Sequence, residues 1–304
     1  MELHDLPIID AHHHLWDLSP GPLHYPWLQD RDAKAHFLGD QGSLRRDYLP
    51  EHYRADARLH NVVGTVHVEA ECDRRQQLDE TRWLTRLHAR HGLPSAIVAH
   101  SWLHTPDAPS ILAQQAAFPL VRGIRSKPVT RNSPEAVLQD TCGSMQDPRW
   151  RSGLRLLVQF SLSWDLRVPT WHLEEAADVV RENPQLPVVL NHTGFPWDRS
   201  SKGLTMWRSG MRALARLDNC MCKLSCLCIP EGQWDYEGNR AIILETIDLF
   251  GPDRCMFASN FPVDGMQVDF DTMFNDYKRI TDGFTAVERR SLFHDTAARF
   301  YRLD

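Results

Sequence analysis

Three consecutive histidines, His12, His13 and His14, stand in the motif DAHHHLW near the start of the chain. The segment PIIDA, which is apolar apart from Asp10, precedes them and predicts a β-strand, in which successive side chains point to opposite faces. We therefore expect His12 and His14 to share a face and His13 to point away from it. Two imidazoles on one face can bind a metal ion or polarise a substrate oxygen, although a structural pair bonded to the backbone explains so short a motif equally well.

Other apolar segments of the chain also end in polar side chains that could take part in chemistry. The eight segments typical of strands begin at Pro7, Val62, Ser95, Leu120, Leu154, Leu186, Asn219 and Arg254. Beyond the first histidines, the side chains at their ends are His67 and Glu69, His100, Arg125 and Lys127, Gln159 and Ser161, Asn191 and His192, Lys223 and Ser225, and Asn260, with Asp264 shortly after it.

The spacing of these segments predicts the fold. From the second one onward they recur at about the length of one strand plus one helix. Helical patterns fill gaps at residues 79–92, 171–183, 204–217 and 239–251, with Gly92 and Gly251 as stop signals. We therefore expect an α/β protein, a single (βα)8 TIM barrel over residues 1–304, with an extended loop at 17–61 after the first strand. An open doubly wound sheet is the rival, but no glycine-rich phosphate fingerprint follows the first strand.

A barrel of this kind would bring the polar residues together. The carboxyl ends of its strands face one shared pocket, where reactive side chains gather. Aromatic residues that follow the strands, including Trp16 and Trp164, could form an apolar wall around a ring-shaped substrate.

Composition and charge exclude several classes of function. The chain has 304 residues, of which 42% are hydrophobic and 24% charged, and this excludes wholesale disorder. Its net charge is -6 and its basic residues are scattered, so the sequence indicates no nucleic-acid partner and no membrane surface. We expect no membrane span, no signal peptide and a cytoplasmic location. The expected partner is a small molecule, and a homo-oligomer is compatible with the sequence.

Four of the seven cysteines lie in the segment CMCKLSCLC at residues 220–228. They occupy even positions, whereas zinc knuckles place two residues between paired cysteines. We expect reduced cysteines that pack in the core, with Lys223 and Ser225 on the opposite face of the strand.

The chain resembles the amidohydrolase superfamily, in the branch of amidohydrolase-related proteins that includes 2-pyrone-4,6-dicarboxylate lactonase, fuconolactonase and 4-sulfomuconolactone hydrolase. The resemblance rests on IIDAHHHLWD, GIRSKP, PVVLNHTGFP and CMFASNFPVD, which follow in the expected order over nearly the whole chain. It implies a (βα)8 hydrolase that acts at the carboxyl end of the barrel, often on a lactone. It matches His12 and His14 to the first-strand histidine pair of the family, and His192 to the sixth-strand histidine.

Two departures from the family pattern bear on a metal ion. Asn260 stands where the family has the eighth-strand aspartate, and an amide has no basic form at neutral pH. The fifth strand, expected within LVQFSLSWDL, lacks the histidine of metal-dependent relatives. We therefore expect either no cofactor or one divalent metal ion, zinc or manganese, and we favour the metal-free site. A bound metal would be held by His12, His14 and His192, with Glu69 or Asp264 as the anionic ligand.

Without a metal, positive side chains must stabilise the oxyanion. Arg125 is the leading candidate, because its guanidinium can also hold a substrate carboxylate through two hydrogen bonds, and Lys127 and Lys223 follow. For Lys223 we favour an inter-strand ion pair instead. The attacking water needs a base, and we expect Asp264 to serve because it lies just past Asn260.

Our main hypothesis is a hydrolase that opens a lactone or a similar small cyclic ester bearing a carboxylate. The expected catalytic residues are His12, His14, Arg125, Lys127, His192 and Asp264, and the expected substrate-binding residues are Glu69, His100, Asn260, Trp16 and Trp164. Two alternatives stay open. One is a metal-dependent decarboxylase or hydratase of the same superfamily, and the other is a partner-dependent subunit with a degraded active site.

Overall fold

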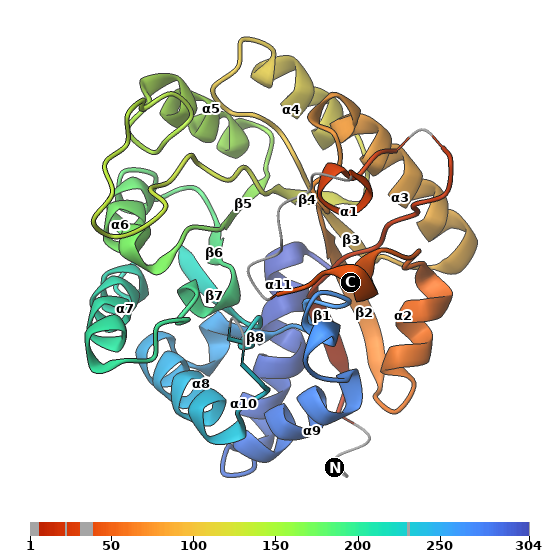
Figure 1. Cartoon of the computed structure of the whole chain (residues 1–304), viewed down its shortest axis with the longest axis vertical. Coiled ribbons are helices and arrows are strands. Elements are labelled where there is room, and N and C mark those ends of the chain that lie inside the picture. The colour runs from red at the N-terminus through yellow and green to blue at the C-terminus, as the bar shows by residue number, and fades with distance from the viewer. Residues whose placement is uncertain (1–5, 22, 31–38, 230–231, 304) are drawn as a thin grey trace.

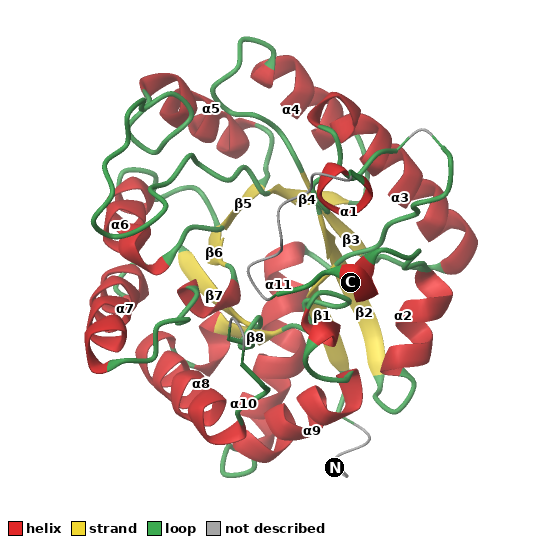
Figure 2. Ribbon diagram, viewed as in Figure 1, coloured by secondary structure: helices red, strands yellow, loops and turns green. Residues whose placement is uncertain are grey.

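The computed structural model contains one sheet of eight parallel strands in chain order, surrounded by helices as a nearly closed (βα)8 barrel (Figures 1 and 2). It describes residues 6–21, 23–30, 39–229 and 232–303. The strands are β1 (Ile8–His13), β2 (Val62–Val68), β3 (Ala96–Ala99), β4 (Val121–Ile124), β5 (Ser163–Leu166), β6 (Val188–Leu190), β7 (Cys220–Leu224) and β8 (Cys255–Phe257). The helices are α1 (Pro26–Gln29), α2 (Pro50–Ala57), α3 (Gln77–His91), α4 (Ala108–Ala116), α5 (Pro148–Gln159), α6 (Leu173–Arg181), α7 (Ser201–Ala215), α8 (Tyr236–Phe250), α9 (Phe270–Ile280), α10 (Ala286–Arg290) and α11 (Thr296–Tyr301).

Two backbone hydrogen bonds join the segment after β8 to the end of β1. The amide of Asn260 donates to the carbonyl of His12 at 2.7 Å, and the amide of His14 donates to the carbonyl of Phe261 at 2.8 Å. This seam brings the first and last strands together at their carboxyl ends. It therefore places the histidine motif beside Asn260, although the two are far apart in sequence.

Apolar side chains fill much of the barrel interior below the site. Small and β-branched side chains from the strands, among them Ile9, Val66 and Val189, form one buried cluster with Phe300 and Tyr301 of the C-terminal helix α11. Figure 1 shows α11 within the ring of strands, and these contacts place it against the interior. A second, larger cluster fills the layer between the strands and the surrounding helices. The interior is thus packed, as expected for a barrel of this size.

The fifth predicted strand is wrong. The segment that begins at Leu154 belongs to helix α5, which starts at Pro148 and is capped by the Asp147 side chain on the amide of Arg149. Its buried residues Trp150, Gly153, Leu154 and Leu157 recur at helical spacing. The true fifth strand, β5, lies further along at Ser163–Leu166, so Gln159 and Ser161 do not end a strand.

The other predicted elements are confirmed. Seven of the eight predicted strand segments contain the observed strands, and the four helical patterns correspond to α3, α6, α7 and α8. Gly92 ends α3 in the left-handed conformation, with φ of 68°. The expected extended loop at 17–61 carries α1 and α2, and its residues 22 and 31–38 lie outside the described residues. Within the described chain, every helix is too short or too polar to cross a bilayer.

The cysteines of β7 and the segment after it pack as expected. Cys220, Cys222 and Cys228 are buried in the outer cluster, between strands and helices. On the opposite face, Lys223 and Ser225 point to the polar residues of neighbouring strands. Burial raises the pKa of the Cys220 thiol to about 12, which favours the neutral thiol.

An ion pair inside the barrel links β5 to β7. The Lys223 ammonium donates to the Asp165 carboxylate at 2.6 Å, and both side chains are fully buried. The hydroxyl of Tyr301 and the amide of Asn191 also donate to this carboxylate, at 3.1 and 3.0 Å. The favoured interpretation of Lys223 as an inter-strand ion pair is therefore confirmed.

We expect Lys223→Met to lower the free energy of unfolding by roughly 3–5 kcal/mol, because the buried Asp165 carboxylate loses its cation. The double variant Asp165→Asn/Lys223→Met should recover a large part of this loss. Chemical denaturation followed by circular dichroism measures both effects. The matched control is Arg208→Met, which removes a partly exposed pair with Glu245 and should cost less than about 1 kcal/mol. Equal losses for Lys223→Met and the control would contradict the prediction.

Candidate active site

A cavity of about 250 Å³ lies at the carboxyl ends of the strands. Five of the residues predicted for the site line it: His14, Arg125, Lys127, His192 and Asn260. Two further charged residues, Glu71 and Arg167, also face it, and Trp27 and Phe195 provide aromatic surface. The pocket therefore combines imidazole, amide and cationic groups in a space suited to a small molecule.

The first-strand histidines have the predicted orientations. The rings of His12 and His14 lie 5.0 Å apart between centroids, and the ring of His192 lies 4.4 Å from that of His12. His13 points away from this group and packs on Tyr53 with a centroid distance of 4.6 Å. His12 itself is fully buried and lies beneath the cavity rather than on its lining.

Hydrogen bonds orient the two imidazoles that line the cavity. His14 Nδ1 lies 2.7 Å from the carbonyl of Val68, so this nitrogen must carry the proton and donate it. Nε2 of His14 is then an acceptor, with no partner among the described residues. His192 Nδ1 similarly contacts the hydroxyl of Ser225 at 2.9 Å. Burial, followed by the charge of Arg125, lowers the pKa of both rings well below 6.5, so both are neutral.

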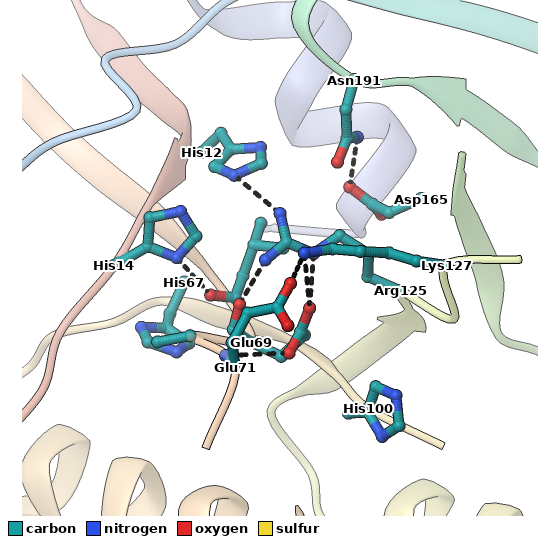
Figure 3. Close-up of polar contacts among 12 residues, drawn as sticks. His12, His14, His67, Glu69, Glu71, His100, Arg125, Lys127, Asp165 and Asn191 are labelled. Carbon is teal, nitrogen blue, oxygen red and sulfur yellow. Dashed lines mark hydrogen bonds and ion pairs between the residues drawn. The ribbon is translucent and has the colours of Figure 1, made fainter. Parts of the chain in front are cut away.

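A buried carboxylate, Glu69, organises the cationic side of the site (Figure 3). Its Oε1 accepts from Arg125 Nε at 2.7 Å, and its Oε2 accepts from Arg74 Nη1 at 2.9 Å and from the amide of Glu71 at 3.0 Å. Burial opposes ionisation of Glu69, but Arg125, Arg74 and Lys127 outweigh it and hold its pKa well below the usual range. Glu69 therefore positions the cations and, contrary to expectation, does not line the cavity.

Arg125 is held by more than one bond. In addition to the ion pair, its Nη2 donates to the backbone carbonyl of Glu69, and its Nη1 lies 3.5 Å from Nε2 of His12 (Figure 3). Glu69 thus engages the Nε/Nη2 edge of the guanidinium, whereas Nη1 and the second hydrogen of Nη2 form its other forked edge. The expectation that Arg125 holds a substrate carboxylate bidentately stays a prediction, and a role for Nη1 at a developing oxyanion is also compatible with the geometry.

Lys127 and Glu71 form an ion pair at the cavity wall. Glu71 also accepts from Arg74 Nη2 at 2.9 Å. Burial, followed by the nearby charge of Arg167, lowers the pKa of Lys127 to about 7. The ion pair with Glu71 opposes this shift, because it stabilises the charged form of Lys127.

Asn260 stands between Asp264 and the cavity. Its Nδ2 donates to Asp264 Oδ1 at 2.8 Å, whereas Asp264 is fully buried and does not line the pocket. Burial raises the pKa of Asp264 to about 7. Contact between the Asp264 carboxylate and the substrate would require Asn260 to move, so the geometry favours a positioning role for Asp264 over the expected role as base.

Several site residues have a left-handed backbone. Glu71, His192 and Asn260 have φ of 60°, 60° and 54°, in a region that side chains other than glycine rarely occupy. All three follow strands and line the cavity. Strain of this kind gathers at functional sites because it aims side chains that a regular backbone would not.

Three other predicted substrate-binding residues lie outside the cavity. His100 is buried and uses Nδ1 to contact Gln77 Oε1 at 3.0 Å. Trp16 is buried behind His14, with its Nε1 bonded to the carbonyl of Arg46 at 2.7 Å. Trp164 points to the helices and packs on Trp150 of α5, because Asp165 next to it occupies the inward position.

Sequence reasoning missed Glu71, Arg167, Trp27 and Phe195, which all line the cavity. Arg167 directly follows β5, so the misplaced fifth strand hid its position at a strand end. Trp27 lies in α1, within the first loop, where the sequence has no motif. Correct assignment of SWDL as the strand would have identified Arg167.

The three histidines do not form a favourable metal site. In the described part of the chain, no group of three or more His, Cys, Asp or Glu side chains is arranged to hold an ion. Arg125 Nη1 lies 3.5 Å from His12 Nε2, where a dication would be repelled, and both oxygens of Glu69 are already bonded to cations. The proposed ligand set of His12, His14 and His192 with Glu69 therefore does not fit a metal ion in this arrangement.

Comparison with known proteins finds a family model, related sequences and related structures that each cover nearly the whole chain. A protein-family model described as amidohydrolase matches residues 9–303. Protein y4mH of Sinorhizobium fredii is 38% identical over 299 residues, which cover 98% of this chain and 99% of that protein. The L-fucono-1,5-lactonase of Burkholderia multivorans is 29% identical over 311 residues, with coverage of 97% and 96%. A crystal structure of an amidohydrolase from Burkholderia multivorans with bound zinc has a TM-score of 0.81 at 26% identity, covering 98% of this chain and 99% of that one.

We expect this protein, purified without added metal, to contain far less than one equivalent of zinc or manganese. Added zinc should leave the melting temperature unchanged, since a ligand that binds the folded state raises it. Elemental analysis and thermal unfolding with and without a chelator measure these effects. One tightly held equivalent, together with a lower melting temperature after chelation, would show that the histidines rearrange around a metal.

Proposed function

The chain belongs to the amidohydrolase family, and from this premise we propose that it is a hydrolase that opens a lactone or a similar small cyclic ester bearing a carboxylate. Similarity to an L-fucono-1,5-lactonase over nearly the whole chain supports this reaction class. The observation that carries the proposal is the cavity itself. It places two neutral imidazoles, oriented by their Nδ1 contacts, together with buried cations.

In the proposed reaction, His14 activates the water. Its Nδ1 proton is committed to the carbonyl of Val68, so Nε2 offers a lone pair to the cavity. Nε2 takes one proton from water while the water oxygen attacks the lactone carbonyl carbon. His192 provides a second imidazole edge that can orient the same water, and the Asn260 amide lies beside it in the cavity wall.

The cationic groups stabilise the negative charge that develops on the carbonyl oxygen. Arg125 is held rigidly by Glu69, so its charge is in place before the reaction begins. Lys127 adds a second positive group in the same wall. When the tetrahedral intermediate collapses, the ring C–O bond breaks and the proton on His14 passes to the leaving alkoxide. The product is an open-chain hydroxy acid, whose new carboxylic acid group loses the second proton of the water to solvent and becomes a carboxylate.

Two other functions have less support. A metal-dependent decarboxylase or hydratase of the same superfamily would need a metal beside His12, where the Arg125 guanidinium lies. A partner-dependent subunit with a degraded site would not need to keep His14, Arg125 and Lys127 together around one cavity.

A panel of five- and six-membered lactones, with and without a carboxylate, tests the proposal by the acid released on hydrolysis. We expect turnover of at least one member, and we expect His14→Gln to lower kcat/KM by roughly a hundredfold or more through loss of the base. The control is His91→Gln, a partly exposed position at the end of α3. Absence of turnover across the panel, or an equal effect of the two variants, would contradict the proposal.

The pH dependence of kcat/KM distinguishes His14 from Asp264 as the base. A base acts unprotonated, and the pKa of His14 is well below 6.5, so the rate should not rise between about pH 6 and pH 7. Asp264, whose pKa is raised to about 7, would instead give a rate that climbs through pH 7. A climbing profile that Asp264→Asn abolishes would assign the base to Asp264.

A further inference from the structure

Arg167 places a guanidinium in the cavity wall, and no carboxylate of the described residues pairs with it. It follows the last residue of β5, and its guanidinium lies 4.9 Å from the centroid of the Phe195 ring. Among the described residues, it makes neither an ion pair nor a hydrogen bond to an acidic side chain. A buried or partly buried guanidinium usually has such a partner, because charge without compensation is costly to remove from water.

The acidic side chains around the site are fully used by other cations. Both oxygens of Glu69 are bonded to Arg125 and Arg74, and Glu71 is paired with Lys127 and Arg74. The site thus contains four basic side chains and two carboxylates, those of Glu69 and Glu71. Of the four, Arg167 is not bonded to either carboxylate among the described contacts. Burial, followed by repulsion from Arg125, lowers the pKa of Arg167 to about 10, which still leaves it charged at neutral pH.

The position of Arg167 suits a residue that binds a ligand better than a residue that stabilises the fold. The contact with Phe195 supports the flat face of the guanidinium and leaves its hydrogen-bonding edge available. Phe195 follows His192 closely in the chain, so the anchor and the imidazole edge belong to neighbouring parts of the same wall. A planar guanidinium recognises a carboxylate through two parallel hydrogen bonds.

We propose that Arg167 is the residue that binds a carboxylate of the substrate, and that the preferred substrate is an acidic lactone such as that of an aldaric acid. This inference rests on the proposed lactone hydrolysis and adds its specificity. The ester carbonyl would lie toward His14 and Arg125, and the carboxylate toward Arg167. The hydrolysis product would then be a dicarboxylate with its two ends at Arg125 and Arg167.

Direct binding of dicarboxylates tests the anchor without any turnover. The probes are malonate, succinate, glutarate and adipate, measured by isothermal titration calorimetry on the full chain at concentrations up to about 10 mM. We expect at least one probe to bind, and we expect Arg167→Met to weaken it by tenfold or more. Arg167→Lys, which keeps the charge but loses the fork, should weaken it less. Arg208→Met, remote on α7, should leave it unchanged.

Turnover of two matched lactones tests the specificity. D-glucaro-1,4-lactone carries a carboxylate where D-glucono-1,4-lactone carries a hydroxymethyl group. We expect a higher kcat/KM for the acidic lactone, and we expect Arg167→Met to raise its KM tenfold or more while changing neither kcat nor the KM of the neutral lactone appreciably. Equal melting temperatures of wild type and variants confirm that the fold is intact.

The outcomes separate this inference from the proposed function. Dicarboxylate binding that depends on Arg167, without hydrolysis of any lactone, would overturn the hydrolase proposal and keep the anchor. Lactone hydrolysis with no dicarboxylate binding, or with equal binding by wild type and Arg167→Met, would overturn the anchor and keep the hydrolase. A preference for the neutral lactone that Arg167→Met leaves unaltered would also overturn it.

Discussion

The buried ion pair between Glu69 and Arg125 is the constraint on which the site depends. Glu69 is fully buried, and it stays ionised because two guanidiniums and a backbone amide bond to it. Through this carboxylate, Arg125 is held with its Nη1 3.5 Å from Nε2 of His12, where its positive charge disfavours a metal ion on that nitrogen. The pair therefore decides the electrostatic character of the site, in which buried cations lie beside imidazoles whose pKa is held well below 6.5.

The same pair explains why the roles of the charged residues differ from simple expectation. Glu69 occupies the Nε/Nη2 edge of Arg125, so only the Nη1/Nη2 edge of this guanidinium is left for a substrate oxygen. Lys127 forms an ion pair with Glu71. Arg167 has no acidic partner among the described residues and packs on Phe195. Substrate binding would thus complete a charge network that the protein leaves unbalanced, which favours an anionic ligand over a neutral one.

Asn260 shows how the fold accommodates the loss of the family aspartate. Its backbone is left-handed, and its backbone amide donates a hydrogen bond to the carbonyl of His12, so it is held at the seam between β1 and β8. Asp264 accepts a hydrogen bond from its side chain, and burial keeps the pKa of this acid near neutrality. The Asp264 carboxyl group thus orients the Asn260 side chain in the cavity wall.

The sequence by itself determined the barrel and most of the site. Alternation along a strand is a local property, so it placed His12 with His14, and Lys223 with Ser225, correctly. Strand spacing predicted the parallel order that gathers His14, Arg125, Lys127, His192 and Asn260 around one cavity. Only the tertiary structure decided which charges pair, because pairing depends on side chains of different strands and loops that meet in space. It moved the fifth strand to SWDL, since the Leu154 segment buries its apolar side as a helix. With that shift, Trp164 points outward and Arg167 lies in the cavity wall. The tertiary structure also sets Asp264 behind Asn260.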